Sequence, residues 1–403
     1  MLSGCGLIKI QRIYSFRAPK VLPVRVLMIS KAIVVGIYQR KLEAIAQHGV
    51  ELLALAPPAW RDERGALPLE RAYTKGYRLE TVPIVFNGSY HLHFYRELGW
   101  WIEQFRPAIV HIDEEPYNLA AWQGLWHARR VGAKTVLFSW QNIDRRYPPP
   151  FCWGERWALA QADVLIAGTE GAAAVWRAKG CRGQLPVIAQ FGTDAELFRP
   201  PAHRPERPFT IGYFGRLVEE KGLRVLLRAA AQLGGAWRLI LLGGGPLRPA
   251  LEAEAARLGI AARVTFRGQV SSTAMSAQYH DLDALALPSL TRPNWKEQFG
   301  RVLVEAMASG VPVVGSDSGA IPDVIGSAGL VVPEGDAAAL ARALDWLRGD
   351  PALRADLSAR GRARVLAHFT HERIAEATVA VYRALAGQSA RAADPSPTPE
   401  TVV

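Results

Sequence analysis

Two glutamates, Glu297 and Glu305, enclose the segment Gln-Phe-Gly-Arg-Val-Leu-Val. The pattern over residues 301–308 predicts a helix that stops at Gly310. Glu297 and Gly300 then lie at or before its N-terminus, where backbone N–H groups point toward a bound anion. Glu305 lies about two turns further along, so both carboxylates can face one cleft and accept hydrogen bonds from sugar or ribose hydroxyls. An acidic helix start and a helical salt bridge would explain each glutamate alone, but not the pair together with Phe-Gly.

Two cations follow another strand-like segment, which ends at Gly215. Arg216 comes directly after this glycine and Lys221 stands near the start of the next predicted helix. Arginine binds phosphate through two parallel hydrogen bonds, and lysine adds a point charge, so the two side chains suit a diphosphate. A strand-to-helix turn with two surface cations is also common without any ligand, and the pattern alone leaves both interpretations open.

The next predicted strand ends in three consecutive glycines, including Gly243 and Gly245, which are followed by Pro246. Glycines let a ligand approach the backbone closely, and proline is well suited to the first helical position. The spacing does not match the Gly-x-Gly-x-x-Gly fingerprint of dinucleotide-binding proteins. A tight turn without a ligand explains the glycines equally well. In the first half of the chain, His111 precedes Asp-Glu-Glu at a strand end and is a candidate catalytic residue or an ordinary satisfied histidine.

Short apolar runs alternate with longer amphipathic segments, which is the rhythm of βαβ units with parallel strands. The break at residues 199–208 is rich in Pro and charge, as a linker is. We therefore expect an α/β protein with two Rossmann-like doubly wound domains facing each other across a cleft, at the carboxyl ends of the strands. Strands are predicted at residues 24–29, 51–56, 81–86, 108–112, 134–138, 163–167 and 186–190, and again at 209–214, 238–242, 264–267, 284–287 and 311–315.

The expected domain boundaries follow from this rhythm. Residues 24–200 form the first domain and residues 201–370 the second. A final helix at 371–386 is expected to pack back on the first domain. The segments 1–23 and 387–403 are expected to be a flexible extension and a disordered tail.

Composition excludes several classes of protein. With 49% apolar and 21% charged residues among 403, the chain can fill large cores. We find neither an apolar run of membrane-spanning length nor a convincing secretory signal, and expect a cytoplasmic protein. Three scattered cysteines indicate no disulfide framework or zinc site. Most of the net charge of +11 lies in the first half, which fits an anionic lipid surface or a phosphorylated acceptor, although an ordinary solvated surface explains it as well. Basic residues interleaved with acids argue against nucleic acid.

These motifs together resemble the retaining glycosyltransferases of family 4, which have the fold called GT-B. The resemblance covers roughly residues 24–386 and is most specific in the second half. It rests on Gly215-Arg216-Leu217…Lys221-Gly222, the glycines from Gly243 to Pro246, the pair Glu297 and Glu305, Ser318-Gly-Ala-Ile-Pro-Asp323, and Phe191-Gly-Thr-Asp…Phe198-Arg-Pro200 before the linker.

The resemblance implies a set of roles for these residues. The second domain would bind a nucleoside diphosphate sugar as co-substrate, without a cofactor or metal, and the sugar would be transferred with retention of its anomeric configuration. The family's donor-binding residues map onto Gly215, Arg216 and Lys221 for the diphosphate, Glu305 for the ribose, Glu297 for the transferred sugar, and Gly243, Gly245, Phe299, Gly300 and Arg301 for the surrounding turns. The Asp281-Leu-Asp283 sequence only opens a strand, so we expect no metal there.

The acceptor domain departs from the family pattern. Relatives carry a glycine pair after the first strand, where this chain has only Gly36, and Lys31 could substitute for that contact electrostatically. Relatives also have a histidine after the strand that ends here near Phe138. Gln141 or Asn142 could take over its hydrogen bonding to the sugar.

The sequence therefore predicts a glycosyltransferase that acts on a glycan or lipid-linked acceptor of the cell envelope, in the cytoplasm and in peripheral contact with the inner membrane face. Two alternatives stay open: a sugar-nucleotide epimerase on the same fold, and a non-catalytic protein that binds sugar nucleotides. A phosphorylase would need a lysine for pyridoxal phosphate, which cannot be assigned.

Overall fold

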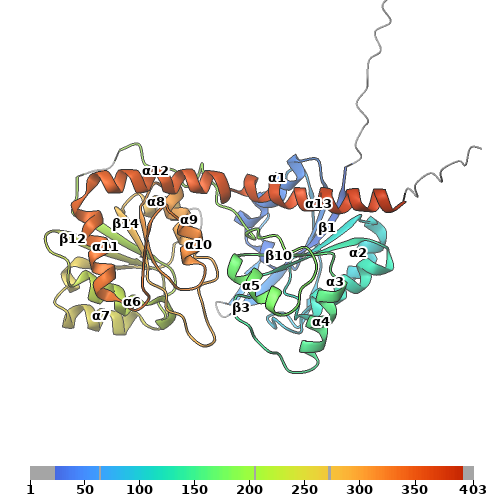
Figure 1. Cartoon of the computed structure of the whole chain (residues 1–403), viewed down its shortest axis with the longest axis horizontal. Coiled ribbons are helices and arrows are strands. Elements are labelled where there is room, and N and C mark those ends of the chain that lie inside the picture. Colours follow the sequence, from blue (N-terminus) through green and yellow to red (C-terminus); the bar gives the residue numbers. More distant parts are fainter. Residues whose placement is uncertain (1–22, 63–64, 204–205, 271–273, 394–403) are drawn as a thin grey trace, which may run out of the picture.

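The computed structural model describes residues 23–62, 65–203, 206–270 and 274–393 (Figure 1). The predicted flexible N-terminal extension, except for residue 23, lies outside these ranges. The predicted disordered tail, 387–403, has to be corrected in its first part, because residues 387–393 continue the last helix; residues 394–403 lie outside the described residues.

The N-terminal half is built on a six-stranded parallel sheet with the order β10-β9-β8-β1-β2-β5. Its two faces are packed by two separate apolar clusters, one of which lies beneath α2, α3 and α4. The strands are β1 (Arg25–Ile29), β2 (Glu51–Ala56), β5 (Arg78–Thr81), β8 (Ile109–Ile112), β9 (Lys134–Ser139) and β10 (Val164–Ala167). The helices are α1 (Arg40–Gln47), α2 (Leu98–Phe105), α3 (Leu119–Arg130), α4 (Phe151–Gln161) and α5 (Glu170–Ala178).

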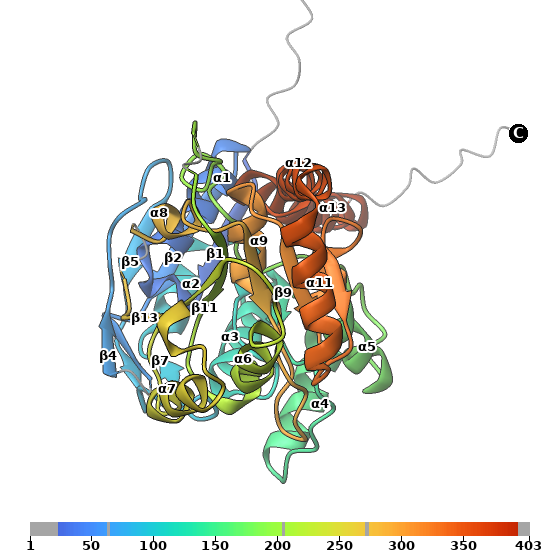
Figure 2. The same cartoon turned by 90° about the vertical axis from the view of Figure 1, so that its left-hand side faces the viewer.

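The C-terminal half, which faces the viewer in Figure 2, repeats this design around one large apolar core. Its sheet has the order β13-β12-β11-β14-β15-β16, and every pair is parallel. The strands are β11 (Phe209–Phe214), β12 (Trp237–Leu242), β13 (Val264–Arg267), β14 (Ala284–Leu287), β15 (Val313–Ser316) and β16 (Leu330–Val332). The helices are α6 (Leu223–Ala230), α7 (Arg248–Arg257), α8 (Met275–Tyr279), α9 (Arg301–Ala308), α10 (Ile321–Ile325) and α11 (Ala337–Gly349).

Both sheets have the same topology. In each, the first strand in sequence has the second strand on one side and the fourth on the other, so the order reverses between β1 and β8 and again between β11 and β14. Ligands of doubly wound sheets bind outside the carboxyl ends of the strands at such a reversal. The predicted fold class, two Rossmann-like domains, is confirmed.

Two long helices, α12 (Pro351–His368) and α13 (His371–Ala393), run along one side of both halves (Figures 1 and 2). The second helix returns to the N-terminal half and packs against α1. Its apolar face contributes Ile374, Val379, Tyr382 and Leu385 to the core beneath α1.

Some predicted strands differ from the structure. Residues 81–86 do not form one strand, because Pro83 interrupts the segment: β5 ends at Thr81, and β6 (Ile84–Val85) pairs instead with β7 (Phe94–Tyr95). Residues 186–190 make only an isolated bridge between Val187 and Ala167. The strands that went unpredicted are β3 (Ala59–Asp62) and β4 (Gly65–Pro68), which pair with each other, β7, and the edge strand β16.

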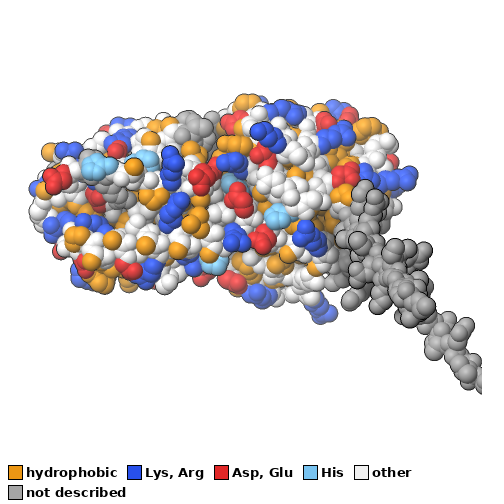
Figure 3. All heavy atoms as spheres, turned by 90° about the horizontal axis from the view of Figure 1, so that it is seen from above, with side chains coloured by type: hydrophobic (Ala, Val, Ile, Leu, Met, Phe, Trp, Pro, Cys, Tyr) orange, Lys and Arg blue, Asp and Glu red, His pale blue; other side chains and the backbone are white. Residues whose placement is uncertain are grey.

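The surface carries no marked segregation of charge on the face shown in Figure 3, where basic and acidic side chains are interspersed over both halves. Among the helices of the described residues, none combines the length and the apolar character needed to cross a membrane.

Candidate active site

A cavity of about 570 Å³ opens where β11 and β12 end. Its floor is made by the turns after these strands, and its sides by residues after β13 and by the first turn of α9. Asp62 and Tyr90 of the N-terminal half also line it, so the cavity lies between the two halves. The lining from the C-terminal half consists of Phe214, Gly215, Arg216, Leu242, Gly243, Gly244, Gln269, Val270, Met275 and Val302.

The glycines of this cavity are required by the way the two turns pack. Gly243 has a φ of 137°, and a Cβ atom on it would lie 2.0 Å from the carbonyl oxygen of Gly215. A Cβ on Gly245, at φ 156°, would lie 2.3 Å from the carbonyl oxygen of Leu217. Side chains at these positions would force the two turns apart. Backbone packing is therefore sufficient to explain Gly243 and Gly245, while Gly215, Gly243 and Gly244 also face the cavity.

The two predicted cations occupy different places. Arg216 lines the cavity and lies 3.7 Å from Glu220. Lys221, at the end of the short 3-10 helix Glu219–Lys221, points instead at Glu297: its Nζ lies 2.6 Å from Oε2 of that residue. The hydroxyl of Ser289, which follows β14, donates to the same oxygen at 2.7 Å. The Glu297 carboxylate is thus held between a cation and a hydroxyl, with 7% of the residue exposed.

The second glutamate of the pair has its own partners. Glu305 is buried in α9, where the Tyr279 hydroxyl donates to Oε2 at 2.7 Å and Nε of Arg301 donates to Oε1 at 2.7 Å. Burial and the neighbouring Glu305 raise the pKa of Tyr279, so its hydroxyl stays protonated and donates. The guanidinium of Arg301 also reaches the N-terminal half, where it donates to the Tyr38 hydroxyl at 2.7 Å. The two glutamates therefore belong to separate hydrogen-bonded groups.

The residues between the glutamates form the junction of the two halves. Gly300 precedes α9 with a φ of 76°, which a glycine adopts without strain. The ring of Phe299 lies 5.7 Å from that of Trp140, in the loop after β9, and 5.7 Å from that of Phe369. Asn142 donates from its side chain to the carbonyl oxygen of Glu297 at 3.0 Å, so the loop after β9 holds the backbone of Glu297 in place.

A second, smaller cavity of about 240 Å³ lies at the carboxyl ends of β1, β8 and β9. Gln298 of the C-terminal half lines this cavity, and Tyr90 lines both this cavity and the larger one. The rest of its lining consists of Lys31, Asp113, Glu114, Glu115, Tyr117, Phe138, Trp140 and Gln190.

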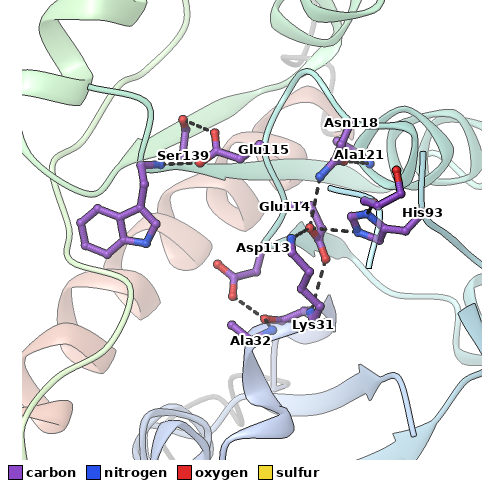
Figure 4. Close-up of polar contacts among 12 residues, drawn as sticks. Lys31, Ala32, His93, Asp113, Glu114, Glu115, Asn118, Ala121 and Ser139 are labelled. Carbon is purple, nitrogen blue, oxygen red and sulfur yellow. Dashed lines mark hydrogen bonds and ion pairs between the residues drawn. The ribbon is translucent and has the colours of Figure 1, made fainter. Parts of the chain in front are cut away.

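Three consecutive carboxylates, Asp113, Glu114 and Glu115, dominate this cavity (Figure 4). Burial raises the pKa of Asp113 although the Ser30 hydroxyl and the Gln190 amide donate to it. Burial also raises the pKa of Glu115, to about 7, against the opposing effect of hydrogen bonds from Ser139 and the Trp140 N–H.

Glu114 differs from its two neighbours because the side chains of Lys31 and His93 lie against it. Lys31 forms an ion pair with it, and Nε2 of His93 lies 3.3 Å away. Although burial acts to raise the pKa of Glu114, these two residues together lower it below its usual range. The ammonium group of Lys31 is therefore committed to Glu114, and it lies over the Trp60 and Tyr90 rings at 5.5 and 6.0 Å.

Two further predicted residues contact the protein itself. The N–H of Gly36 donates to Oε2 of Glu70 at 2.6 Å, so a carboxylate of the chain already occupies this donor. Gln141 is buried behind the loop after β9, where its Nε2 donates to the carbonyl oxygen of Ile143 at 3.1 Å. Its Oε1 is buried and has no hydrogen-bond partner among the described residues.

The catalytic role considered for His111 has to be corrected. Its side chain is completely buried on the face of the sheet that α13 covers, and its Nδ1 is hydrogen-bonded to the Tyr382 hydroxyl. Burial, together with the charge of Lys41, lowers the pKa of His111 well below its usual value, so the ring is neutral. His111 therefore joins α13 to the N-terminal sheet and does not face the cleft. Its neighbours Asp113 and Glu115, which extend past the end of β8, do.

Sequence reasoning missed Tyr90 and Asp62, and it did not single out Asp113 and Glu115. The three acids directly follow β8, and β8 adjoins β1 at the reversal of strand order. The strand order could have pointed to these acids. It is set by pairing between segments far apart in the sequence, however, and local patterns do not reveal it. Tyr90 and Asp62 belong to the hairpin region between β2 and α2, for which the sequence holds no strong pattern.

The chain matches two family models. Residues 37–189 match the glycosyl transferase 4-like domain, and residues 194–364 match the glycosyl transferases of group 1. It is 32% identical over 285 residues to a D-inositol 3-phosphate glycosyltransferase of Mycobacterium marinum, a match that covers 65% of this chain but only 59% of that protein.

The chain is also similar in sequence to a second glycosyltransferase and, in its fold, to a solved structure. The chain is 30% identical to a 2-deoxystreptamine glucosyltransferase of Streptomyces kanamyceticus, over 60% of this chain and 68% of that one. Its fold is similar to that of the Anabaena protein HepE, solved in complex with UDP, with a TM-score of 0.70 and 17% identity over 90% of this chain and all of the other.

Proposed function

We propose, since the chain belongs to the group 1 glycosyltransferases of family 4, that it transfers a sugar from a nucleoside diphosphate to an acceptor hydroxyl with retention of the anomeric configuration. The observation that carries this proposal is the cavity at the ends of β11 and β12, which is lined by three glycines and by Arg216 and adjoins β11, the strand at which the strand order reverses.

The donor would lie in this larger cavity. Its diphosphate would contact the turns at Gly215 and Gly243 and the guanidinium of Arg216, because arginine recognises phosphate through paired hydrogen bonds. The ribose would lie at the first turn of α9. The Glu305 carboxylate could there accept hydrogen bonds from the ribose hydroxyls in place of those it accepts from Arg301 or Tyr279. UDP is the first nucleotide to try because the HepE structure holds it.

The transferred sugar would lie beside Glu297, between the two cavities. Lys221 and Ser289 hold that carboxylate in one orientation, so it can accept hydrogen bonds from sugar hydroxyls in a fixed geometry. As the bond between the anomeric carbon and the diphosphate oxygen breaks, its electron pair passes to the diphosphate, where Arg216 and Lys221 stabilise the growing charge. The acceptor oxygen bonds to the same face of the sugar, and its proton passes to the departing diphosphate oxygen on that face.

The acceptor would lie in the smaller cavity of the N-terminal half. A glycan or a lipid-linked glycan of the cell envelope is our proposal, together with a cytoplasmic location and peripheral contact with the inner membrane face. The excess of basic residues in the first half of the chain supports contact with an anionic surface.

Incubation of the full chain with UDP-, GDP- and ADP-sugars tests the proposal, with mass spectrometry of the products and measurement of free nucleotide. We expect one donor class to yield nucleoside diphosphate and an α- or β-product matching the donor's configuration. Unchanged donors would indicate a protein that binds sugar nucleotides without transfer, and an isomeric donor would indicate an epimerase; either result contradicts the proposal.

A further inference from the structure

The smaller cavity is placed to hold an acceptor next to the donor sugar. It shares Tyr90 with the larger cavity, and its Gln298 adjoins Glu297 in the chain. A ring bound in it would present its hydroxyls toward the place where we put the transferred sugar. This placement rests on the proposed function, and the chemistry of the cavity then decides which class of acceptor fits it.

The lining of the cavity carries three carboxyl groups and one lysine. Burial raises the pKa of Asp113 and Glu115, and an ammonium group bound beside them would favour their ionised forms. Of its three carboxylates, Glu114 is neutralised by Lys31. Asp113 and Glu115 are held by uncharged donors, namely the hydroxyls of Ser30 and Ser139, the amide of Gln190 and the N–H of Trp140. Lys41, which acts on Asp113 electrostatically, is buried in α1 and does not line the cavity. Figure 4 shows Lys31 turned toward Glu114, with Glu115 bonded to Ser139 on the other side.

The walls of the cavity are aromatic. Tyr90, Tyr117, Phe138 and Trp140 line it, and the Trp140 ring is fixed by a hydrogen bond of 2.7 Å from its N–H to Gln190. Flat aromatic faces pack against the C–H surface of a sugar-like ring, and they also attract an ammonium group through their quadrupole. Carboxylates beside such faces complete a site for hydroxyl and ammonium donors.

We propose that the acceptor is a sugar or cyclitol ring that carries a protonated amine, and that a phosphorylated ring is excluded. The ammonium group would bind between Glu115 and the aromatic wall, with ring hydroxyls donating to Asp113. A phosphate in the same place would face two carboxylates in a partly desolvated space, where like charges repel strongly. Arg145 acts on the Tyr117 hydroxyl from outside the lining, but it is exposed and donates to the carbonyl oxygen of Asn294.

Three matched probes test the charge preference: the methyl glycosides of glucosamine, of glucose and of glucose 6-phosphate. Their binding to the full chain in the presence of UDP is measured by tryptophan fluorescence, and transfer is measured with the active donor. We expect the amine to bind about 10-fold more tightly than the neutral ring, because its hydrogen bond to a carboxylate is charge-assisted. The phosphorylated ring should bind most weakly.

The variant Glu115→Gln keeps the shape of the cavity and removes the carboxyl group that would ionise beside the ammonium group, so it should reduce the preference for the amine over the neutral ring to about 2-fold. Glu170→Gln, on the exposed surface of α5, is the matched control and should leave that preference unchanged. The wild-type ranking is decisive even if Glu115→Gln fails to fold.

Equal binding of amine and neutral ring, tighter binding of the phosphorylated ring, or no binding of any probe by a chain that binds UDP and releases it from a donor would each overturn the inference while leaving the proposed function intact. If no nucleotide binds or is released at all, the proposed function itself fails.

Discussion

The two halves of the molecule share one topology but differ in what they place at the carboxyl ends of their strands. The C-terminal sheet ends in glycine turns that line a cavity together with Arg216. The N-terminal sheet ends in three carboxylates and four aromatic rings, and its one lining cation, among the residues that the structure describes, is paired with Glu114. The difference indicates that two sheets with the same strand order can form binding sites for ligands of opposite charge, because the residues that follow each strand set the electrostatics of the site.

The largest effect should come from Glu297, where the two halves meet. Glu297→Gln removes the charge that Lys221 neutralises and changes the contact to the transferred sugar, so the transfer rate should fall by about 100-fold or more, while nucleotide affinity changes little. Steady-state kinetics and calorimetric titration of UDP measure the two quantities. Glu252→Gln, in an exposed pair with Arg248, is the control. Near wild-type transfer in the Glu297 variant would exclude a direct role for this carboxylate.

Two glycine substitutions in the C-terminal half test whether backbone packing requires a glycine at residue 243. Gly243→Ala forces a Cβ atom against the Gly215 carbonyl oxygen and should lower the free energy of unfolding by about 2 kcal/mol or more. Gly244→Ala is the matched substitution, because its Cβ would meet only the Gln269 side chain, at 3.6 Å. Chemical denaturation compares the two. Equal stability of both variants would show that the turns can separate without cost.

The corrected role of His111 makes a smaller prediction. Tyr382→Phe removes the hydroxyl bonded to His111 beneath α13 and should lower the free energy of unfolding by about 1 kcal/mol, with the transfer rate of the folded protein unchanged. Thermal unfolding and kinetics at saturating donor measure both. A variant of normal stability with greatly reduced transfer would restore His111 to the catalytic candidates.

The raised pKa of Glu115, about 7, makes the stability of the protein depend on pH. The folded protein holds a proton that the unfolded chain loses near pH 4.5. The stability from that proton is therefore fully present below about pH 4.5 and is lost as the pH rises through about 7. Between pH 5 and pH 8, the wild type should lose about 2.5 kcal/mol more than Glu115→Gln. Denaturation curves at the two pH values decide this, and parallel curves would mean that the carboxyl is ionised throughout.

The sequence predicts the C-terminal half better than the N-terminal half for a physical reason. Its functional residues stand in short contiguous motifs, and the predicted helix at residues 301–308 coincides with α9. The site in the N-terminal half is assembled from residues far apart in the chain, such as Lys31, Tyr90 and Glu115, whose proximity depends on strand order. Local patterns carry no information about that order.

Two particular residues show the same limit. His111 lies in a strand with apolar residues on both sides, and which face it takes depends on the packing of α13, a helix more than 250 residues away in sequence. Gly36 looked like a ligand-binding donor because nothing local showed that the Glu70 carboxylate would accept from its N–H. In both cases a residue elsewhere in the sequence forms a hydrogen bond with the predicted group, Tyr382 with the His111 ring and Glu70 with the Gly36 N–H, so that group is already occupied within the protein.

Nucleotide binding by two single variants tests the central claim, that donor and acceptor lie on opposite halves. Calorimetric titration with UDP, GDP and ADP should show that Arg216→Ala weakens the preferred nucleotide about 10-fold, since it removes a charge-assisted contact, while Glu115→Gln changes its affinity less than about 2-fold. An unchanged affinity in Arg216→Ala, or an equal loss in Glu115→Gln, would contradict the account.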